Sequence, residues 1–106
     1  MNRGDVRDAE LPGAGRHPVV VVTRNAAIPV LTSVVVVMVT STIRGLPSEV
    51  PLGPVQGLSR DCVANCDNLF TVPKRALGHV RGSLGPTELR RLNDALRLAL
   101  ELERTT

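Results

Sequence analysis

The most regular feature of this 106-residue chain is a pair of valine runs. Residues 19–22 are four valines, and residues 34–39 hold five valines and one methionine. β-Branched side chains favour extended backbone, and apolar runs of this length between polar residues are typical of buried strands. We predict that both runs are strands at the centre of a small sheet, and that the second strand extends to Thr40.

Polar residues gather at the ends of both predicted strands. They are His17, Thr23 and Arg24 around the first run, and Thr40, Ser41, Thr42 and Arg44 after the second. Hydroxyl groups and basic side chains commonly bind nucleic-acid phosphates. We therefore expect these strand ends to converge on one phosphate. Pro18 is expected to begin its strand, where its missing N–H does no harm.

Shorter segments with strand character flank the valine runs, separated by connections rich in Gly and Pro. We predict an exposed first strand with one charged face over residues 3–11, an edge strand over 49–52, a strand over 61–68 with a continuation or neighbour over 69–73, a basic turn over 74–79, and a last strand over 80–84. The proline at position 51 confines residues 49–52 to an edge or an end.

The C-terminal segment has helical periodicity instead. Apolar side chains recur three and four residues apart, at Leu89, Leu92, Leu96 and Ala99, with Ala95, Leu98 and Leu102 widening the stripe. Gly85 is suited to the N-cap and Pro86 to the first helical position. Short strands followed by one helix predict a single α+β domain, mainly β, over residues 1–106: a small barrel or half-barrel with a C-terminal amphipathic helix.

Composition narrows the function. The chain has one Phe and no Trp or Tyr, so modules that read single strands by stacking bases on aromatic side chains are disfavoured. Its 13 Lys and Arg against 10 Asp and Glu give a formal net charge of +3. This mildly basic balance permits a polyanionic partner without requiring one.

The spacing of the cysteines and the hydropathy of the chain lead to predictions about disulfides, metal binding and cellular location. Cys62 and Cys66 are expected in one strand, where residues four apart lie about 13 Å from each other, too far for a disulfide. No second Cys or His pair accompanies them, so we expect reduced thiols and no metal site. We see no signal peptide and no apolar run near the about 20 residues of a membrane span. We therefore expect a soluble cytoplasmic protein with no membrane partner.

Several short motifs, taken in order, resemble the MazF/PemK toxins. They are Arg3-Gly4-Asp5-Val6, Gly15-Arg16-His17-Pro18 with the valines after it, Val39-Thr40-Ser41-Thr42, Asp61-Cys62-Val63, Asp67-Asn68, Leu77-Gly78, and the C-terminal amphipathic helix. The resemblance spans residues 3–102. It depends on the ordered set, because no single motif is specific.

The resemblance implies an SH3-like barrel of short antiparallel strands, a homodimer, and the toxin of a type II toxin–antitoxin system. Members of the family are endoribonucleases that need no metal ion or other cofactor. They cut single-stranded RNA at short sequences, with the RNA's own 2′-hydroxyl as nucleophile, and leave a cyclic phosphate and a 5′-hydroxyl. The implied partners are single-stranded RNA and a cognate antitoxin that occupies the RNA groove.

The resemblance also indicates candidate site residues. The family has a catalytic arginine directly before proline, where this chain has His17 with Arg16 one residue earlier. Either Arg16 still reaches the phosphate, or His17 transfers the proton while Arg16 or Arg24 stabilises charge, or His17 only packs at the rim. Thr40 falls on the family's active-site threonine. We expect the RNA-binding residues to be Arg24, Ser41, Thr42, Arg44 and Lys74.

Two alternatives to the ribonuclease hypothesis stay open. One is a non-enzymatic toxin of the same fold, of the gyrase-poison type, although the C-terminal tail has no apolar or aromatic anchor of the kind interfaces favour. The other is a catalytically weakened relative that binds only RNA or antitoxin. Met38 stands where relatives often have proline, and Arg7 where they often have an aromatic residue. The RNA sequence that is cut cannot be read from these residues.

Overall fold

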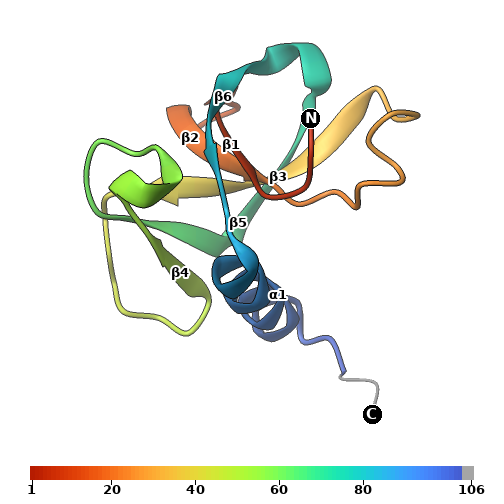
Figure 1. Ribbon diagram of the computed structural model, residues 1–106. Coiled ribbons are helices and arrows are strands. Elements are labelled where there is room, and N and C mark those ends of the chain that lie inside the picture. Colours follow the sequence, from red (N-terminus) through yellow and green to blue (C-terminus); the bar gives the residue numbers. More distant parts are fainter. Residues whose placement is uncertain (104–106) are drawn as a thin grey trace.

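The computed structural model describes residues 1–103, in which one six-stranded antiparallel sheet is followed by one helix (Figure 1). The order across the sheet is β4-β5-β3-β2-β1-β6. The elements are β1 (Asp5–Leu11), β2 (Gly15–Val21), β3 (Ser33–Thr40), β4 (Glu49–Leu52), the 3₁₀ turn η1 (Pro54–Gln56), β5 (Cys62–Pro73), the 3₁₀ turn η2 (Lys74–Ala76), β6 (Leu77–Ser83) and α1 (Pro86–Leu100). The predicted fold class is confirmed, as is the edge position of β4.

The sheet curls into a half-barrel because its two ends meet through the η1 loop. Gly57 packs directly on the carbonyl group of Arg81, and Gly82 packs on the carbonyl group of Gln56. A Cβ atom at either glycine would collide with that backbone, so only glycine permits the approach. Gly57 also has a φ of 87°, in the left-handed region. This contact joins the segment after β4 to β6, although β4 and β6 lie at opposite edges of the sheet.

Apolar side chains of the central strands fill both faces of the sheet. Val37 and Val39 of β3 belong to the cluster that α1 covers, and Val34 and Val36 to a second cluster on the opposite face. This division follows from the alternation of side chains along a strand. Burial on both faces explains why β2 and β3 are runs of valine instead of alternating apolar and polar residues.

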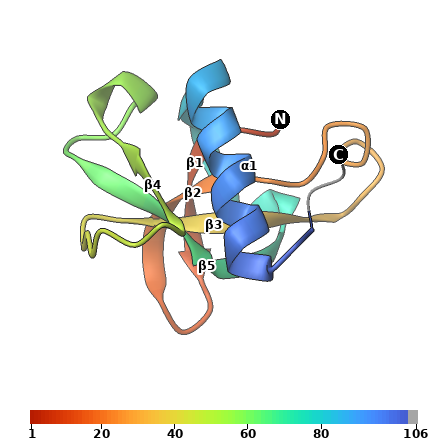
Figure 2. The ribbon, with the colours of Figure 1, turned by 90° about the horizontal axis from the view of Figure 1, so that it is seen from below.

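The helix α1 lies across the sheet, as Figure 2 shows, and begins at Pro86 with Gly85 as N-cap, as predicted. Leu92 and Ala95 are buried. The predicted widening of the stripe is wrong at two positions, because Leu98 is 53% exposed and Leu102 is 56% exposed. Leu98 lies about 110° around the helix axis from the centre of the packed face. Leu102 lies beyond the helix end.

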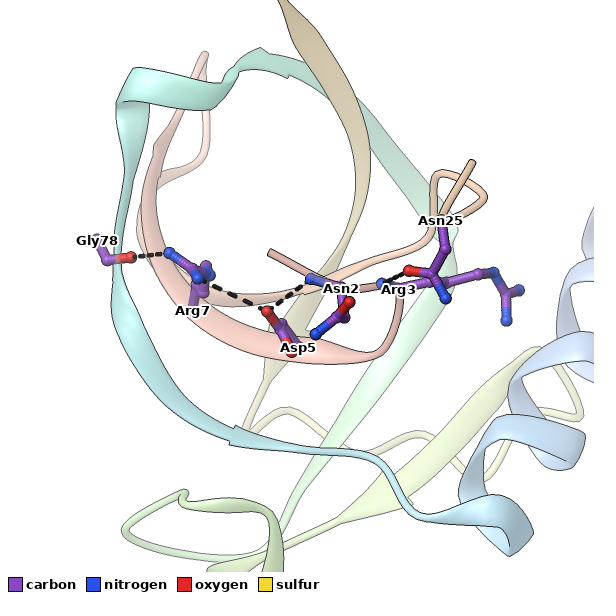
Figure 3. Close-up of polar contacts among 6 residues, drawn as sticks. All are labelled: Asn2, Arg3, Asp5, Arg7, Asn25 and Gly78. Carbon is purple, nitrogen blue, oxygen red and sulfur yellow. Dashed lines mark hydrogen bonds and ion pairs between the residues drawn. The ribbon is translucent and has the colours of Figure 1, made fainter. Parts of the chain in front are cut away.

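The prediction of an exposed first strand is wrong. β1 pairs with β2 on one side and with β6 on the other, and Val6, Ala9 and Leu11 are buried. Its charges are neutralised locally: the Arg7 guanidinium donates to the Gly78 carbonyl at 3.0 Å and lies 3.6 Å from the Asp5 carboxylate (Figure 3). The charged residues of β1 suggested an exposed strand because two of the groups that bind them, the Gly78 carbonyl and the Arg81 guanidinium, are distant in the chain.

Strand β2 begins at Gly15, so the prediction that Pro18 starts the strand is also wrong. Pro18 pairs with Asp8 of β1, but the ladder between β2 and β3 begins only at Val19, which pairs with Met38. Pro18 therefore lies outside that ladder, and its missing N–H breaks no bond there. The predicted basic turn is shorter than expected, because β6 already begins at Leu77.

The continuation predicted for residues 69–73 is confirmed, since they extend β5 without a break. The strand contains a wide irregularity, however. Pairing with β3 passes from Met38 opposite Asn65 to Val37 opposite Leu69, which leaves residues 66–68 without partners on β3. Such bulges bend a strand and redirect its side chains. This one lies beside the end of β3.

Candidate functional site

The end of β3 lies against the beginning of β2. Continuing the pairing of Val19 with Met38 by two residues on each strand brings His17 opposite Thr40. The His17 ring is held between two backbone carbonyl groups. Its Nδ1 atom lies 3.0 Å from the Val39 oxygen, and its Nε2 atom lies 3.2 Å from the Ala14 oxygen, which is on the exposed side.

A cleft of about 200 Å³ opens beside this pair. Its polar lining consists of His17, Thr40, Ser41, Ser59, Arg60 and Arg81, and its apolar lining of Pro18, Val39, Leu58 and Cys62. Arg81 donates to the Asp8 carboxylate at 3.1 Å, whereas Arg60 has no hydrogen bond or ion pair within residues 1–103. Three hydroxyl groups, two guanidinium groups and an imidazole around one small cleft suit a phosphate group.

A second cavity, of about 210 Å³, shares Thr40 with this cleft. Its other lining residues are Met38, Thr42, Arg44, Asn65 and Asn68. The Thr40 hydroxyl oxygen accepts the Thr42 N–H at 3.1 Å, so its own proton is free to be donated to a ligand. Thr40 thus lines both the cleft and the second cavity.

The loop after β3 is fixed by one carboxylate. Glu49 accepts N–H groups from Arg44, Gly45 and Leu46 at 2.8 to 3.3 Å. These bonds use the backbone of Arg44 and leave its guanidinium for the cavity. An otherwise exposed loop is therefore held in one position beside the bulge of β5.

Comparison with known proteins identifies the fold. The family model of the PemK-like, MazF-like toxins of type II toxin–antitoxin systems matches residues 2–100. The chain belongs to this family. It is 40% identical to Endoribonuclease MazF3 of Mycobacterium tuberculosis over 87 residues, which cover 82% of this chain and 84% of that protein. It is also 40% identical to Probable endoribonuclease MazF2 of the same organism over 98 residues, covering 92% and 95%.

Solved structures of family members have the same fold. The M. tuberculosis toxin MazF-mt6 matches with a TM-score of 0.88 and 36% identity, covering 94% of this chain and 99% of that one. A mycobacterial endoribonuclease in complex with its cognate antitoxin matches with a TM-score of 0.86 and 34% identity, covering 99% of both chains. The predicted family resemblance is confirmed.

The cleft of this family member brings together some of the residues expected in the site. His17, Thr40 and Ser41 line it, and Thr42 and Arg44 line the adjoining cavity. Arg16 is not among the lining residues. It is exposed and pairs with Glu10 of β1, and strand alternation directs it to the opposite face from His17.

Two of the expected RNA-binding residues lie at the other end of the sheet. The backbone N–H of Lys74 donates to Thr32, which is about 26 Å along β3 from Thr40. Its ammonium group donates to the Ile28 carbonyl at 2.8 Å and so ties down the loop between β2 and β3. Arg24 follows the end of β2 on the same side and is exposed.

The sequence did not indicate Arg60 or Ser59 as site residues. Nothing in the sequence distinguished Arg81 from the other basic residues expected at the surface. A lone arginine in a glycine-rich loop is usually solvated. These residues reach the cleft only because Gly57 and Gly82 let the η1 loop pack on β6. No local pattern could have indicated this closure.

The two thiols are free, as expected, and differ in position. Cys62 lines the cleft, while Cys66 is 1% exposed. Burial, with a smaller contribution from the Asp67 charge, raises the pKa of the Cys66 thiol to about 11. Within residues 1–103, no three His, Cys, Asp or Glu side chains come together as metal ligands, and no helix is long and apolar enough to cross a membrane.

Proposed function

We propose that this protein is the toxin of a type II toxin–antitoxin system and an endoribonuclease that cleaves single-stranded RNA. Family membership and relatives named endoribonuclease support the activity. The observation that carries the site assignment is the cleft in which His17 and Thr40 face Arg60 and Arg81. A phosphodiester in this cleft would meet a proton-transfer group, hydroxyl donors and two cations.

The proposed reaction is a transesterification within the RNA. The 2′-oxygen forms a bond to phosphorus, its proton passes to a base, and the bond from phosphorus to the 5′-oxygen breaks. The leaving oxygen takes a proton, so the products are a cyclic phosphate and a 5′-hydroxyl. Negative charge increases on the phosphoryl oxygens in the transition state, and donors already oriented toward them lower the barrier.

His17 is the proposed proton-transfer group. A neutral imidazole has a single N–H, which the closer Val39 carbonyl would hold on Nδ1. In this tautomer Nε2 carries no proton and lies 3.2 Å from the Ala14 oxygen, which can only accept, so the ring has to release that contact before Nε2 takes a proton from the 2′-hydroxyl. Thr40 donates its hydroxyl proton to the phosphate, and Arg60 and Arg81 stabilise charge. The position of Arg16 on the opposite face favours His17 over Arg16 for this role.

The proposed partners are single-stranded RNA, a cognate antitoxin and a second copy of the chain. A related endoribonuclease is known in complex with its cognate antitoxin, which supports the second partner. A groove of about 390 Å³ lined by Leu31, Leu69, Leu96 and Leu100 leaves apolar surface that a homodimer would cover. A toxin that cleaves cellular RNA acts in the cytoplasm, which is the proposed location.

The decisive experiment is cleavage of a long single-stranded RNA by the purified protein in EDTA, with analysis of the product ends. Discrete cuts that carry 5′-hydroxyl and cyclic phosphate ends are expected. A protein that cleaves no RNA in a varied set would contradict the proposal. A supercoiling assay with gyrase would then separate a gyrase poison from a weakened relative that only binds RNA or antitoxin.

A further inference from the structure

The cavity beside Thr40, lined by Met38, Thr42, Arg44, Asn65 and Asn68, is not needed for the chemistry of the phosphate. We propose that it binds one base next to the scissile phosphate and selects a keto base, guanine or uracil, over an amino base, adenine or cytosine. This inference rests on the proposed ribonuclease function. The cavity has a volume of about 210 Å³, which is smaller than the about 300–1,000 Å³ of pockets that enclose drug-sized molecules. That size suits a single planar group.

The two segments that line the cavity, the loop after β3 and the bulge of β5, are held in place by hydrogen bonds within the protein. Glu49 fixes the loop that carries Arg44. The Ser48 hydroxyl donates to the Asp67 carboxylate at 2.6 Å, and the Cys66 N–H donates to the Ser48 carbonyl at 3.0 Å. These bonds attach the loop to the bulge of β5. Because the walls are fixed together, a bound base loses little binding energy to reorganisation.

Asn65 is the most informative lining residue. It is only 7% exposed, and its Oδ1 atom accepts the Asp67 N–H at 3.0 Å. Its Nδ2 atom has no partner within residues 1–103. Among the side-chain nitrogen and oxygen atoms of the described residues, only Arg7 Nε is fully buried without a partner, so Asn65 Nδ2 is accessible from the cavity that the residue lines. This open donor is available to a ligand that brings an acceptor.

The guanidinium of Arg44 supplies the second donor and can accept nothing. Two donors complement the oxygen that guanine carries at O6 and uracil at O4, whereas adenine and cytosine present an amino group at the corresponding place. The thioether of Met38 lines the same cavity and offers a polarisable surface for the base. Thr40 belongs to both hollows, so the selected base would adjoin the phosphate that is cut.

The test uses the full-length protein and a single-stranded RNA library with randomised positions, in EDTA, with sequencing of the product ends. The wild type should prefer keto over amino bases about tenfold or more at one position next to the cut. N65D replaces the free amide by a carboxylate oxygen, while its other oxygen still accepts the Asp67 N–H. It should lower the ratio of keto to amino bases at that position about tenfold, with preferences elsewhere unchanged.

A matched control is N25D. The Oδ1 atom of Asn25 also accepts a backbone N–H, that of Arg3 at 2.7 Å (Figure 3), but Asn25 does not line the cavity. N25D makes the same change of charge and should leave every base preference as in the wild type. A uniform fall in cleavage in N65D, without a change in preference, would identify Asn65 as merely structural and overturn the inference.

A second variant keeps the test decisive where N65D does not fold. R44Q changes an exposed side chain that has no bond within residues 1–103 and should weaken the preference at the same position. An unchanged preference in R44Q, or a wild type without a keto preference beside the cut, overturns the inference. Absence of any cleavage by the wild type contradicts instead the proposed ribonuclease function.

Discussion

The imidazole of His17 lies 3.0 Å from the carbonyl oxygen of Val39, the residue directly before Thr40. This contact fixes the ring across two strands at the edge of the cleft. If His17 transfers the proton, H17A should lower the cleavage rate by about 10²-fold or more. R16A is the comparison and should change the rate less than about threefold. Loss of activity in R16A, with H17A active, would assign the role to Arg16.

The hydroxyl of Thr40 is expected to contact the phosphate. T40A should reduce kcat/KM by at least about tenfold, whereas T40S retains the donor and should retain most of the activity. Thr71 is an exposed threonine on β5 outside both hollows and provides a control in T71A. Circular dichroism should show the same helix content in all three variants. Full activity in T40A would remove Thr40 from the site.

Lys74 is expected to stabilise the fold instead of binding RNA. K74M removes the bond to Ile28 and should lower the free energy of unfolding by about 1.5–3 kcal/mol, the range for hydrogen bonds to charged groups. The cleavage rate per folded molecule and its salt dependence should not change. Urea denaturation measures the first quantity, with R75A at the neighbouring exposed position as control. A weaker salt dependence in K74M would instead indicate a phosphate contact.

Closure of the half-barrel depends on Gly57. G57A should destabilise the protein by about 2 kcal/mol or more, because the new methyl group meets the Arg81 carbonyl and the φ of 87° is unfavourable for alanine. Gly13 has a similar φ of 74° but no atom within 4 Å of an added Cβ. G13A therefore isolates the backbone strain and should cost about 1 kcal/mol. Equal losses of unfolding free energy in G57A and G13A would mean that the close contact between Gly57 and β6 does not contribute to stability.

The buried thiol of Cys66 predicts a dependence of stability on alkaline pH. Its pKa is raised from 9.0 to about 11 in the folded protein, so the unfolded chain releases the proton first as the pH rises. The stabilisation should be complete below pH 9 and decline between pH 9 and 11. Urea denaturation at pH 7 and pH 10 should show a smaller decline in C66A than in the wild type. Identical declines would contradict the linkage.

Much of the fold follows from local physics that the sequence alone displays. β-Branched residues made β2 and β3 strands, Pro51 kept β4 at an edge, and Gly85 and Pro86 set the start of α1. Each depends on the steric preferences of a few neighbouring residues. For the same reason, Thr40 was expected at the end of its strand.

The tertiary structure decided which residues meet. Arg60 and Arg81 reach the cleft of His17 because two glycines allow distant backbone segments to touch. Asn65 borders its cavity because β5 shifts register beside Met38, and Arg16 faces away from His17 because adjacent residues of a strand alternate. Register and closure are collective results of packing the whole sheet, so they cannot be read from any one stretch of the chain.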